Sequence, residues 1–108
     1  MAQLSTNENR ALADFREALE ADFGASDVRL FGSRARGEGD AESDLDVFVV
    51  VPILSWDIEK SIYGLSFDIS LRHDVLISPI LYSQDDIKNP SIQISPLYKT
   101  VQREGVRI

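Results

Sequence analysis

Residues 32–51 read GSRARGEGDAESDLDVFVVV, and this stretch decides how we expect the chain to fold. Its second half, Leu45 to Val51, is a continuous run of apolar, mostly β-branched residues that is closed by Pro52. Such a run predicts a central strand buried on both faces. Side chains at positions i and i+2 of a strand point to one face, so Asp44 and Asp46 should project together, with Cα atoms about 6–7 Å apart.

The two aspartates at the head of this strand predict a metal site. Carboxylates on one face repel each other, and a divalent cation removes that repulsion. Magnesium prefers oxygen ligands and brings substrate phosphates with it, so Asp44 and Asp46 should hold one Mg²⁺ ion or share two. The alternative is a solvated strand end that carries two surface acids.

Gly32 and Ser33 predict a phosphate-binding turn just before this strand in the chain. Glycine lets a phosphate approach the backbone closely because it has no side chain. The Ser33 hydroxyl and the exposed N–H groups of the turn can bind anionic oxygens. An ordinary turn with a helix cap is the alternative interpretation.

Arg34 and Arg36 follow the turn, and each could neutralise charge on a triphosphate. The alternative is that both are solvated charges that pair with Glu38 or Glu42.

The rest of the sequence predicts helices and strands on both sides of this stretch. Ser5 and Glu8 have the spacing of a capping box, and apolar residues then recur at helical spacing up to Gly24. The other expected elements are a strand over residues 28–31, a helix from 56 toward 70, a strand over 74–79 that Pro79 ends, a helical turn over 83–88 and a helix from 95 to near 105. This order predicts an α/β (α+β) fold, a small mixed β-sheet flanked by helices, with residues 1–108 as a single domain.

Composition excludes several classes of protein. The chain has 108 residues, a formal net charge of −7 and no cysteine. The negative charge argues against direct nucleic-acid binding, and the missing cysteines exclude disulfides and thiolate metal sites. No apolar stretch approaches the roughly 20 residues that cross a bilayer, and no signal peptide is visible, so we expect a cytoplasmic protein.

The stretch from Gly32 to Val51 resembles the signature of the minimal nucleotidyltransferases in the polymerase-beta-like superfamily. That signature is a glycine-serine pair, about ten residues, and then Asp-x-Asp on a strand. The resemblance implies the polymerase-beta-like nucleotidyltransferase fold. It also implies a third metal-binding and catalytic aspartate on a later strand, for which Asp74 is the match. The implied nucleotide-binding residues are Gly32, Ser33, Arg34, Arg36 and Ser43, and the implied catalytic and metal-binding residues are Asp44, Asp46 and Asp74.

The resemblance implies a function as well. Small members of this family are often partners of HEPN-domain toxins and act as antitoxins by transferring AMP from ATP to a toxin tyrosine hydroxyl. Mg²⁺, as two ions, and ATP would then be the cofactor and the substrate. Two alternatives stay open: an antitoxin that neutralises its toxin by binding alone, and a nucleotidyltransferase for a small molecule such as an aminoglycoside. A homo-oligomer could complete the pocket in the latter case.

Overall fold

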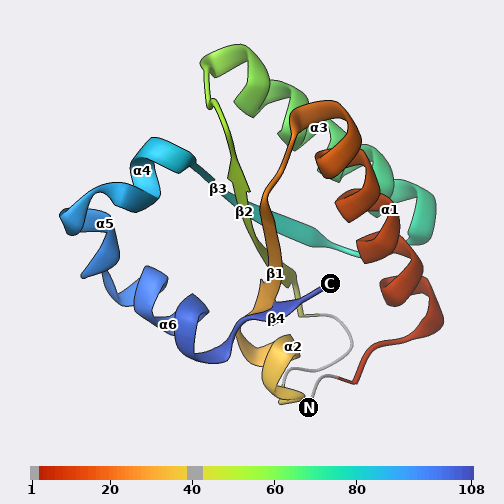
Figure 1. Ribbon diagram of the computed structural model, residues 1–108. Coiled ribbons are helices and arrows are strands. Elements are labelled where there is room, and N and C mark those ends of the chain that lie inside the picture. The colour runs from red at the N-terminus through yellow and green to blue at the C-terminus, as the bar shows by residue number, and fades with distance from the viewer. Residues whose placement is uncertain (1–2, 39–42) are drawn as a thin grey trace.

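The protein is a four-stranded sheet with helices on both faces, seen in a computed structural model that describes residues 3–38 and 43–108 (Figure 1). The helices are α1 (Thr6–Phe23), α2 (Ser33–Arg36), α3 (Trp56–His73), α4 (Gln84–Lys88), α5 (Pro90–Gln93) and α6 (Pro96–Glu104). The strands are β1 (Asp27–Phe31), β2 (Leu45–Val51), β3 (Ile77–Ser83) and β4 (Val106–Arg107). The predicted mixed sheet flanked by helices is thus confirmed.

The strand order is β3-β2-β1-β4. β1 pairs antiparallel with β2 and with β4, whereas β2 and β3 are parallel and joined through α3. A parallel pair needs such a crossover, because its second strand must start at the same end as the first. The start of β2 and the start of β3 therefore lie at one edge of the sheet, beside the end of β1.

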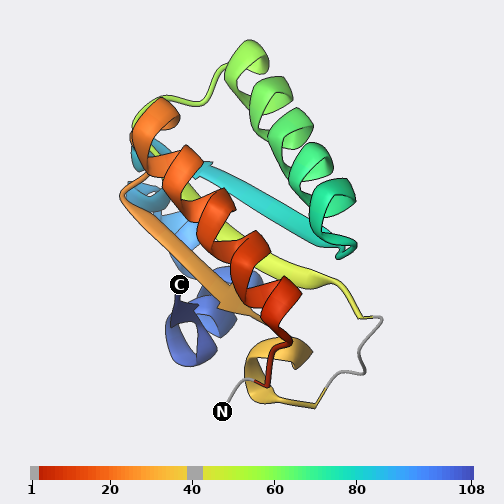
Figure 2. The ribbon, with the colours of Figure 1, turned by 90° about the vertical axis from the view of Figure 1, so that its right-hand side faces the viewer.

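Two apolar clusters cover the two faces of the sheet. Leu45, Val47 and Val49 of β2 pack with α1 and α3, and the capping box of Ser5 and Glu8 starts α1 as expected. Phe48 and Val50 point the other way, toward Leu97, Tyr98 and Val101 of α6. Figure 2 shows α1 and α3 side by side on their face of the sheet. Because alternate residues of β2 belong to different clusters, each position along β2 has a defined face.

The third strand is not where the sequence placed it. We expected a strand from Asp74 that ends at Pro79, but β3 runs from Ile77 to Ser83 and contains Pro79 in its interior. Proline is tolerated there because β3 is an edge strand, so one side of its backbone needs no hydrogen-bond partner.

The outer side of α3 carries exposed apolar residues. Trp56 is 76% exposed and Tyr63 is 44% exposed. The inner face of α3 is already filled by Ile62 and Ile69, which are buried. Among the residues that the structure describes, no helix is long and apolar enough to cross a membrane.

Candidate active site

One row of residues crosses the sheet at the edge where β2 begins. Phe31, at the end of β1, pairs with Asp46, and Asp46 pairs with Ser78 near the start of β3. Paired residues of neighbouring strands present their side chains on the same face. Asp46 alternates with Leu45 and Val47, so its carboxylate lies on the face that α6 partly covers.

Gly32 lies directly against the carboxylate of Asp46. Its φ of 79° and ψ of −162° form a conformation that side chains strongly disfavour. A Cβ atom placed on Gly32 would lie 2.6 Å from Oδ2 of Asp46, well inside contact distance. The turn at Gly32 and the Asp-x-Asp pair are therefore brought together, as the sequence predicted, and the missing side chain is what allows the contact.

Asp46 is half-buried and lacks a compensating charge. Burial raises the pKa of the Asp46 carboxyl above its usual value, and the nearby negative charge of Asp44 raises it further. Within the described part of the chain, no hydrogen bond or ion pair reaches the Asp46 carboxylate. Asp44 is exposed beside it. A carboxylate whose ionised form is disfavoured by burial and by a neighbouring acid has the electrostatics of a cation site.

The carboxylate oxygens at this site are suitable ligands for magnesium. Asp44 and Asp46 supply carboxylate oxygens, which are the ligands that Mg²⁺ takes from proteins together with water and phosphate oxygens. Among residues 3–38 and 43–108 there is no cluster of three or more His, Cys, Asp or Glu side chains that could hold a metal. The described residues therefore offer two carboxylates at this point, and solvent and a phosphorylated substrate could supply further ligands.

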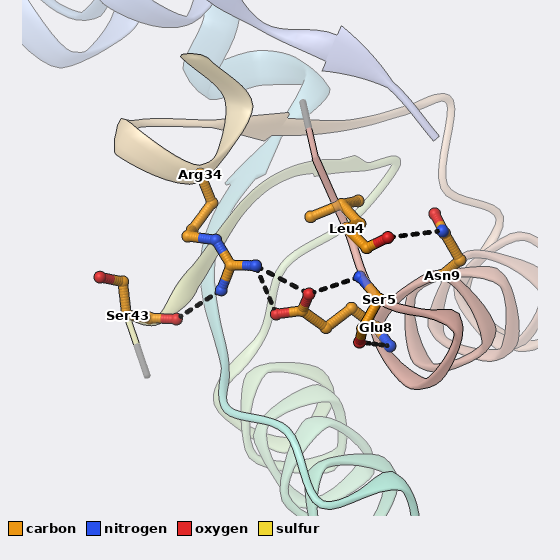
Figure 3. Close-up of polar contacts among 6 residues, drawn as sticks. All are labelled: Leu4, Ser5, Glu8, Asn9, Arg34 and Ser43. Atoms are coloured by element: carbon orange, nitrogen blue, oxygen red, sulfur yellow. Dashed lines mark hydrogen bonds and ion pairs between the residues drawn. The ribbon is translucent and has the colours of Figure 1, made fainter. Parts of the chain in front are cut away.

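Arg34, for which we weighed phosphate binding against pairing with Glu38 or Glu42, is paired with Glu8 in the structure (Figure 3). Its guanidinium is buried, lies 2.7 Å from both carboxylate oxygens of Glu8 in α1, and donates a 3.2 Å hydrogen bond from Nη1 to the carbonyl of Ser43. The arginine thus connects the first turn of α1, the helix α2 and the residue before Asp44. This arrangement makes it a positioning residue of the fold.

Ser33 and Ser43 lie near the aspartates in different ways. Ser33 is the first residue of α2, directly after Gly32, and its side chain is partly exposed. Ser43 is partly exposed and directly precedes Asp44, and its carbonyl accepts the hydrogen bond from Arg34. Ser33 is thus at the Gly32 turn as expected, and Ser43 takes part in holding the chain that leads into β2.

Arg36 is at the surface and is held by two glutamates. It donates to Glu38 at 2.8 Å and to Glu104 of α6 at 2.9 Å. The hydrogen bond to Glu38, followed by that to Glu104, raises the pKa of the Arg36 guanidinium, and the bond from Arg36 lowers the pKa of Glu104. The expected alternative pairing with Glu38 is confirmed, whereas Glu42 lies outside the described residues. Because Arg36 is exposed, its side chain can still exchange these partners for a phosphate.

Asp74 is not beside the aspartate pair. It ends α3 in the left-handed conformation, with φ 54° and ψ 49°, three residues before β3 begins. It lines a cavity together with Ser5, Glu8 and Ser43, on the side of the sheet that α1 covers. The residue that β3 does place beside Asp46 is Ser78. The strand position that we assigned to Asp74 was therefore wrong.

The sequence did not predict that Glu8 and Glu104 form ion pairs with the arginines of α2. Glu8 was visible only as a capping residue, and nothing local indicates that Arg34, 26 positions away, is its ion-pair partner. Glu104 lies 68 positions from Arg36. Contacts of this range depend on how the helices are placed on the sheet, and no short motif encodes them.

Comparison with known proteins gives a consistent result. The sequence profile of the nucleotidyltransferase domain family matches residues 12–103. Two proteins of Methanocaldococcus jannaschii, both provisionally named as protein adenylyltransferases, are similar to the chain. The first is 39% identical over 75 residues, which are 62% of this chain and 76% of that protein. The second is 32% identical over 101 residues, which are 92% of this chain and 95% of that protein.

Solved structures show the same architecture. A provisionally assigned minimal nucleotidyltransferase superposes with a TM-score of 0.63 at 25% identity, and the match covers 100% of both chains. A chain from a mutant of the toxin–antitoxin complex MntA-HpeT superposes with a TM-score of 0.59 at 18% identity, covering 98% of this chain and 72% of that one. The second likeness concerns the fold alone.

Proposed function

Because the chain belongs to the nucleotidyltransferase domain family, and within it to the minimal nucleotidyltransferases, we propose that it transfers AMP from ATP to a hydroxyl of a partner toxin. We infer that the reaction depends on Mg²⁺, takes place in the cytoplasm and makes the chain an antitoxin. The observation that carries the proposal is the Asp46 carboxylate, half-buried against Gly32, with a pKa raised by burial and by the negative charge of Asp44. A bound cation would offset the repulsion between these two carboxylates. A cation placed beside phosphates can also promote nucleotidyl transfer.

The nature of the acceptor rests on the relatives. Those in M. jannaschii are named for transfer of an adenylyl group to protein, and one structural neighbour comes from a toxin–antitoxin complex. We propose a HEPN-domain toxin as the partner and a tyrosine hydroxyl as the acceptor, as the family resemblance implies. The net charge of −7 suits a toxin whose own working surface is basic.

The proposed reaction forms one bond and breaks one. The acceptor oxygen attacks the α-phosphorus of ATP, the bond from that phosphorus to the β-bridging oxygen breaks, and pyrophosphate leaves with the electron pair. The hydroxyl proton leaves as the new O–P bond forms, and we propose that an ionised carboxylate of the Asp44–Asp46 pair accepts it. Bound Mg²⁺ would supply charge neutralisation at the phosphates.

The protein residues provide positioning and charge. Asp44 and Asp46 would hold the cation on the face of the sheet that α6 partly covers. Gly32 leaves room for a phosphate beside the backbone, and the Ser33 hydroxyl is available next to it. Arg36 would turn from Glu38 to the triphosphate, because a guanidinium at the surface can change anionic partners at small cost.

The decisive experiment is transfer of label from ATP to the toxin. The chain is incubated with α-³²P-ATP, Mg²⁺ and the co-purified partner, and label on the partner is measured by gel. We expect the Asp44→Asn, Asp46→Asn double variant to label it at least about a thousandfold more slowly, as expected when groups that stabilise transition-state charge are removed. Asp68→Asn serves as the matched control, because Asp68 is an exposed acid on α3 away from this site. Equal labelling by the double variant and the control would refute the proposal.

The second candidate function is neutralisation by binding alone. It gains weight from the absence of a third metal-binding side chain among the described residues. In cells that express the toxin, the Asp44→Asn, Asp46→Asn variant separates the two. Loss of rescue, with the variant still bound to the toxin, supports transfer, whereas full rescue means that masking suffices.

A further inference from the structure

We propose that Ser78 faces the metal site in the place of a third acidic ligand, so that the chain holds a divalent cation firmly only together with a nucleoside triphosphate. This inference rests on the proposed nucleotidyl transfer for the role of the triphosphate. The placement of Ser78 rests on the sheet register alone.

The position of Ser78 follows from the pairing of β2 with β3. Asp46 and Ser78 are register partners in a parallel pair, with the matches Leu45–Ile77 and Val47–Pro79 on either side. Adjacent strands lie about 4.8 Å apart, and register partners share a face. The Ser78 side chain therefore leaves the sheet on the same side as the Asp46 carboxylate, and it is partly exposed there.

No acidic side chain replaces it from elsewhere on β3. The strand reads ISPILYS from Ile77 to Ser83. The acid nearest in sequence before it, Asp74, shares its cavity with Glu8 and Ser43 on the α1 side. Among residues 3–38 and 43–108, the site face thus presents the carboxylates of Asp44 and Asp46 and the neutral hydroxyl of Ser78 at the start of β2 and β3.

The negative charge and the number of oxygen ligands at the site determine how tightly it binds a cation. Mg²⁺ takes six oxygen ligands and gives up water reluctantly, so two carboxylates, one of them exposed, hold it weakly. A triphosphate adds oxygens and negative charge at the same place. Binding of the cation and of the nucleotide is then coupled, and by linkage each strengthens the other by the same factor. Because serine is neutral, Ser78 adds no further negative charge beside Asp46 when no cation is bound.

The test counts bound Mn²⁺ by electron paramagnetic resonance, with and without the non-reactive analogue α,β-methylene-ATP. We expect the wild-type chain to bind Mn²⁺ at least about tenfold more tightly when the analogue is present. We expect Ser78→Asp to bind Mn²⁺ alone at least about tenfold more tightly than wild type, because a third carboxylate joins the set. Ser61→Asp is the matched control, since it adds the same charge at an exposed position of α3.

Three further results decide the inference. Ser78→Asn, which adds an oxygen donor without charge, should give a smaller gain and covers the case in which Ser78→Asp folds poorly. Adding Asp46→Asn should abolish the gain of Ser78→Asp. If neither substitution at position 78 binds Mn²⁺ more tightly than Ser61→Asp, the placement of Ser78 is wrong. A gain in Ser78→Asp with no analogue binding by any chain would sustain that placement but overturn the coupling and the proposed function.

Discussion

Near the start of β2, two charged side chains are shielded from water, one on each side of the sheet. They differ in the charges that surround them. Arg34 is 5% exposed, and its charge is met by Glu8 and by the Ser43 carbonyl (Figure 3). Asp46 is half-buried, and the charge that bears on its pKa is that of Asp44, which has the same sign. Contacts within the fold compensate the charge of Arg34. The described residues bring no opposite charge to Asp46, and because an uncompensated charge lowers stability, we interpret this side of the sheet as the candidate binding site.

Breaking the Arg34 region should have the largest effect on stability. Arg34→Met leaves the Glu8 carboxylate buried without its partner, and we expect the free energy of unfolding to fall by about 3–5 kcal/mol. Urea denaturation measures this change. Arg10→Met is the matched control on the exposed side of α1 and should stay within about 0.5 kcal/mol of wild type. A loss below about 1 kcal/mol would mean that the pair acts like a surface salt bridge.

Breaking the contact between Gly32 and Asp46 should act mainly on catalysis. Gly32→Ala puts a methyl group 2.6 Å from Oδ2 of Asp46 and must displace the carboxylate. A shift of about 1 Å in a reacting group costs roughly a hundredfold in rate, about 2.7 kcal/mol, and we expect a loss of AMP transfer of that size. Gly64→Ala, where a Cβ meets nothing within 4 Å, should leave the rate unchanged and slightly stabilise α3. Equal rates for the two variants would contradict the close approach.

Neutralising Asp46 should have the smallest effect on stability. The effect should be stabilising, opposite in sign to that of Arg34→Met. The folded chain binds a proton at Asp46 more readily than the unfolded chain does, because its pKa is raised on folding. Ionised Asp46 therefore lowers stability as pH rises through that pKa, and the cost vanishes below the ordinary aspartate value. Near neutral pH we expect Asp46→Asn to raise Tm by roughly 2 °C.

Thermal unfolding at neutral pH and at about pH 3, below the ordinary aspartate pKa, tests this sign. At the lower pH the two chains should melt together. Asp68→Asn removes the same charge at an exposed position and controls for the general relief of a chain with net charge −7. A fall in Tm for Asp46→Asn at neutral pH would show that the carboxylate is compensated within the fold.

Local features of the sequence predicted the elements that depend on local physics. The capping residue Ser5 marked the start of α1, and the apolar run up to Val51 marked a strand buried on both faces. The glycine-serine pair and the Asp-x-Asp pair were placed together correctly, because β1 and β2 pair antiparallel, with Phe31 beside Asp46.

What the sequence did not predict depends on register and on distant contacts. Pro79 reads as the end of a strand, and only its place on an edge strand lets β3 continue through it. That shift moved Asp74 out of the strand and brought Ser78 beside Asp46. Arg34 looked like a phosphate ligand because it directly follows the turn at Gly32 and Ser33, whereas its ion-pair partner Glu8 lies 26 positions earlier in the chain, in α1.

The carboxylate of Glu8 serves two structures at once. It accepts the N–H of Ser5 at 2.8 Å, which closes the first turn of α1, and it pairs with Arg34, which holds the carbonyl of Ser43. The first turn of α1 therefore cannot fray without loosening the segment that enters β2, although some 38 residues separate Ser5 from Ser43. The two segments should open and close as one cooperative unit, with amide protons that exchange with solvent in step.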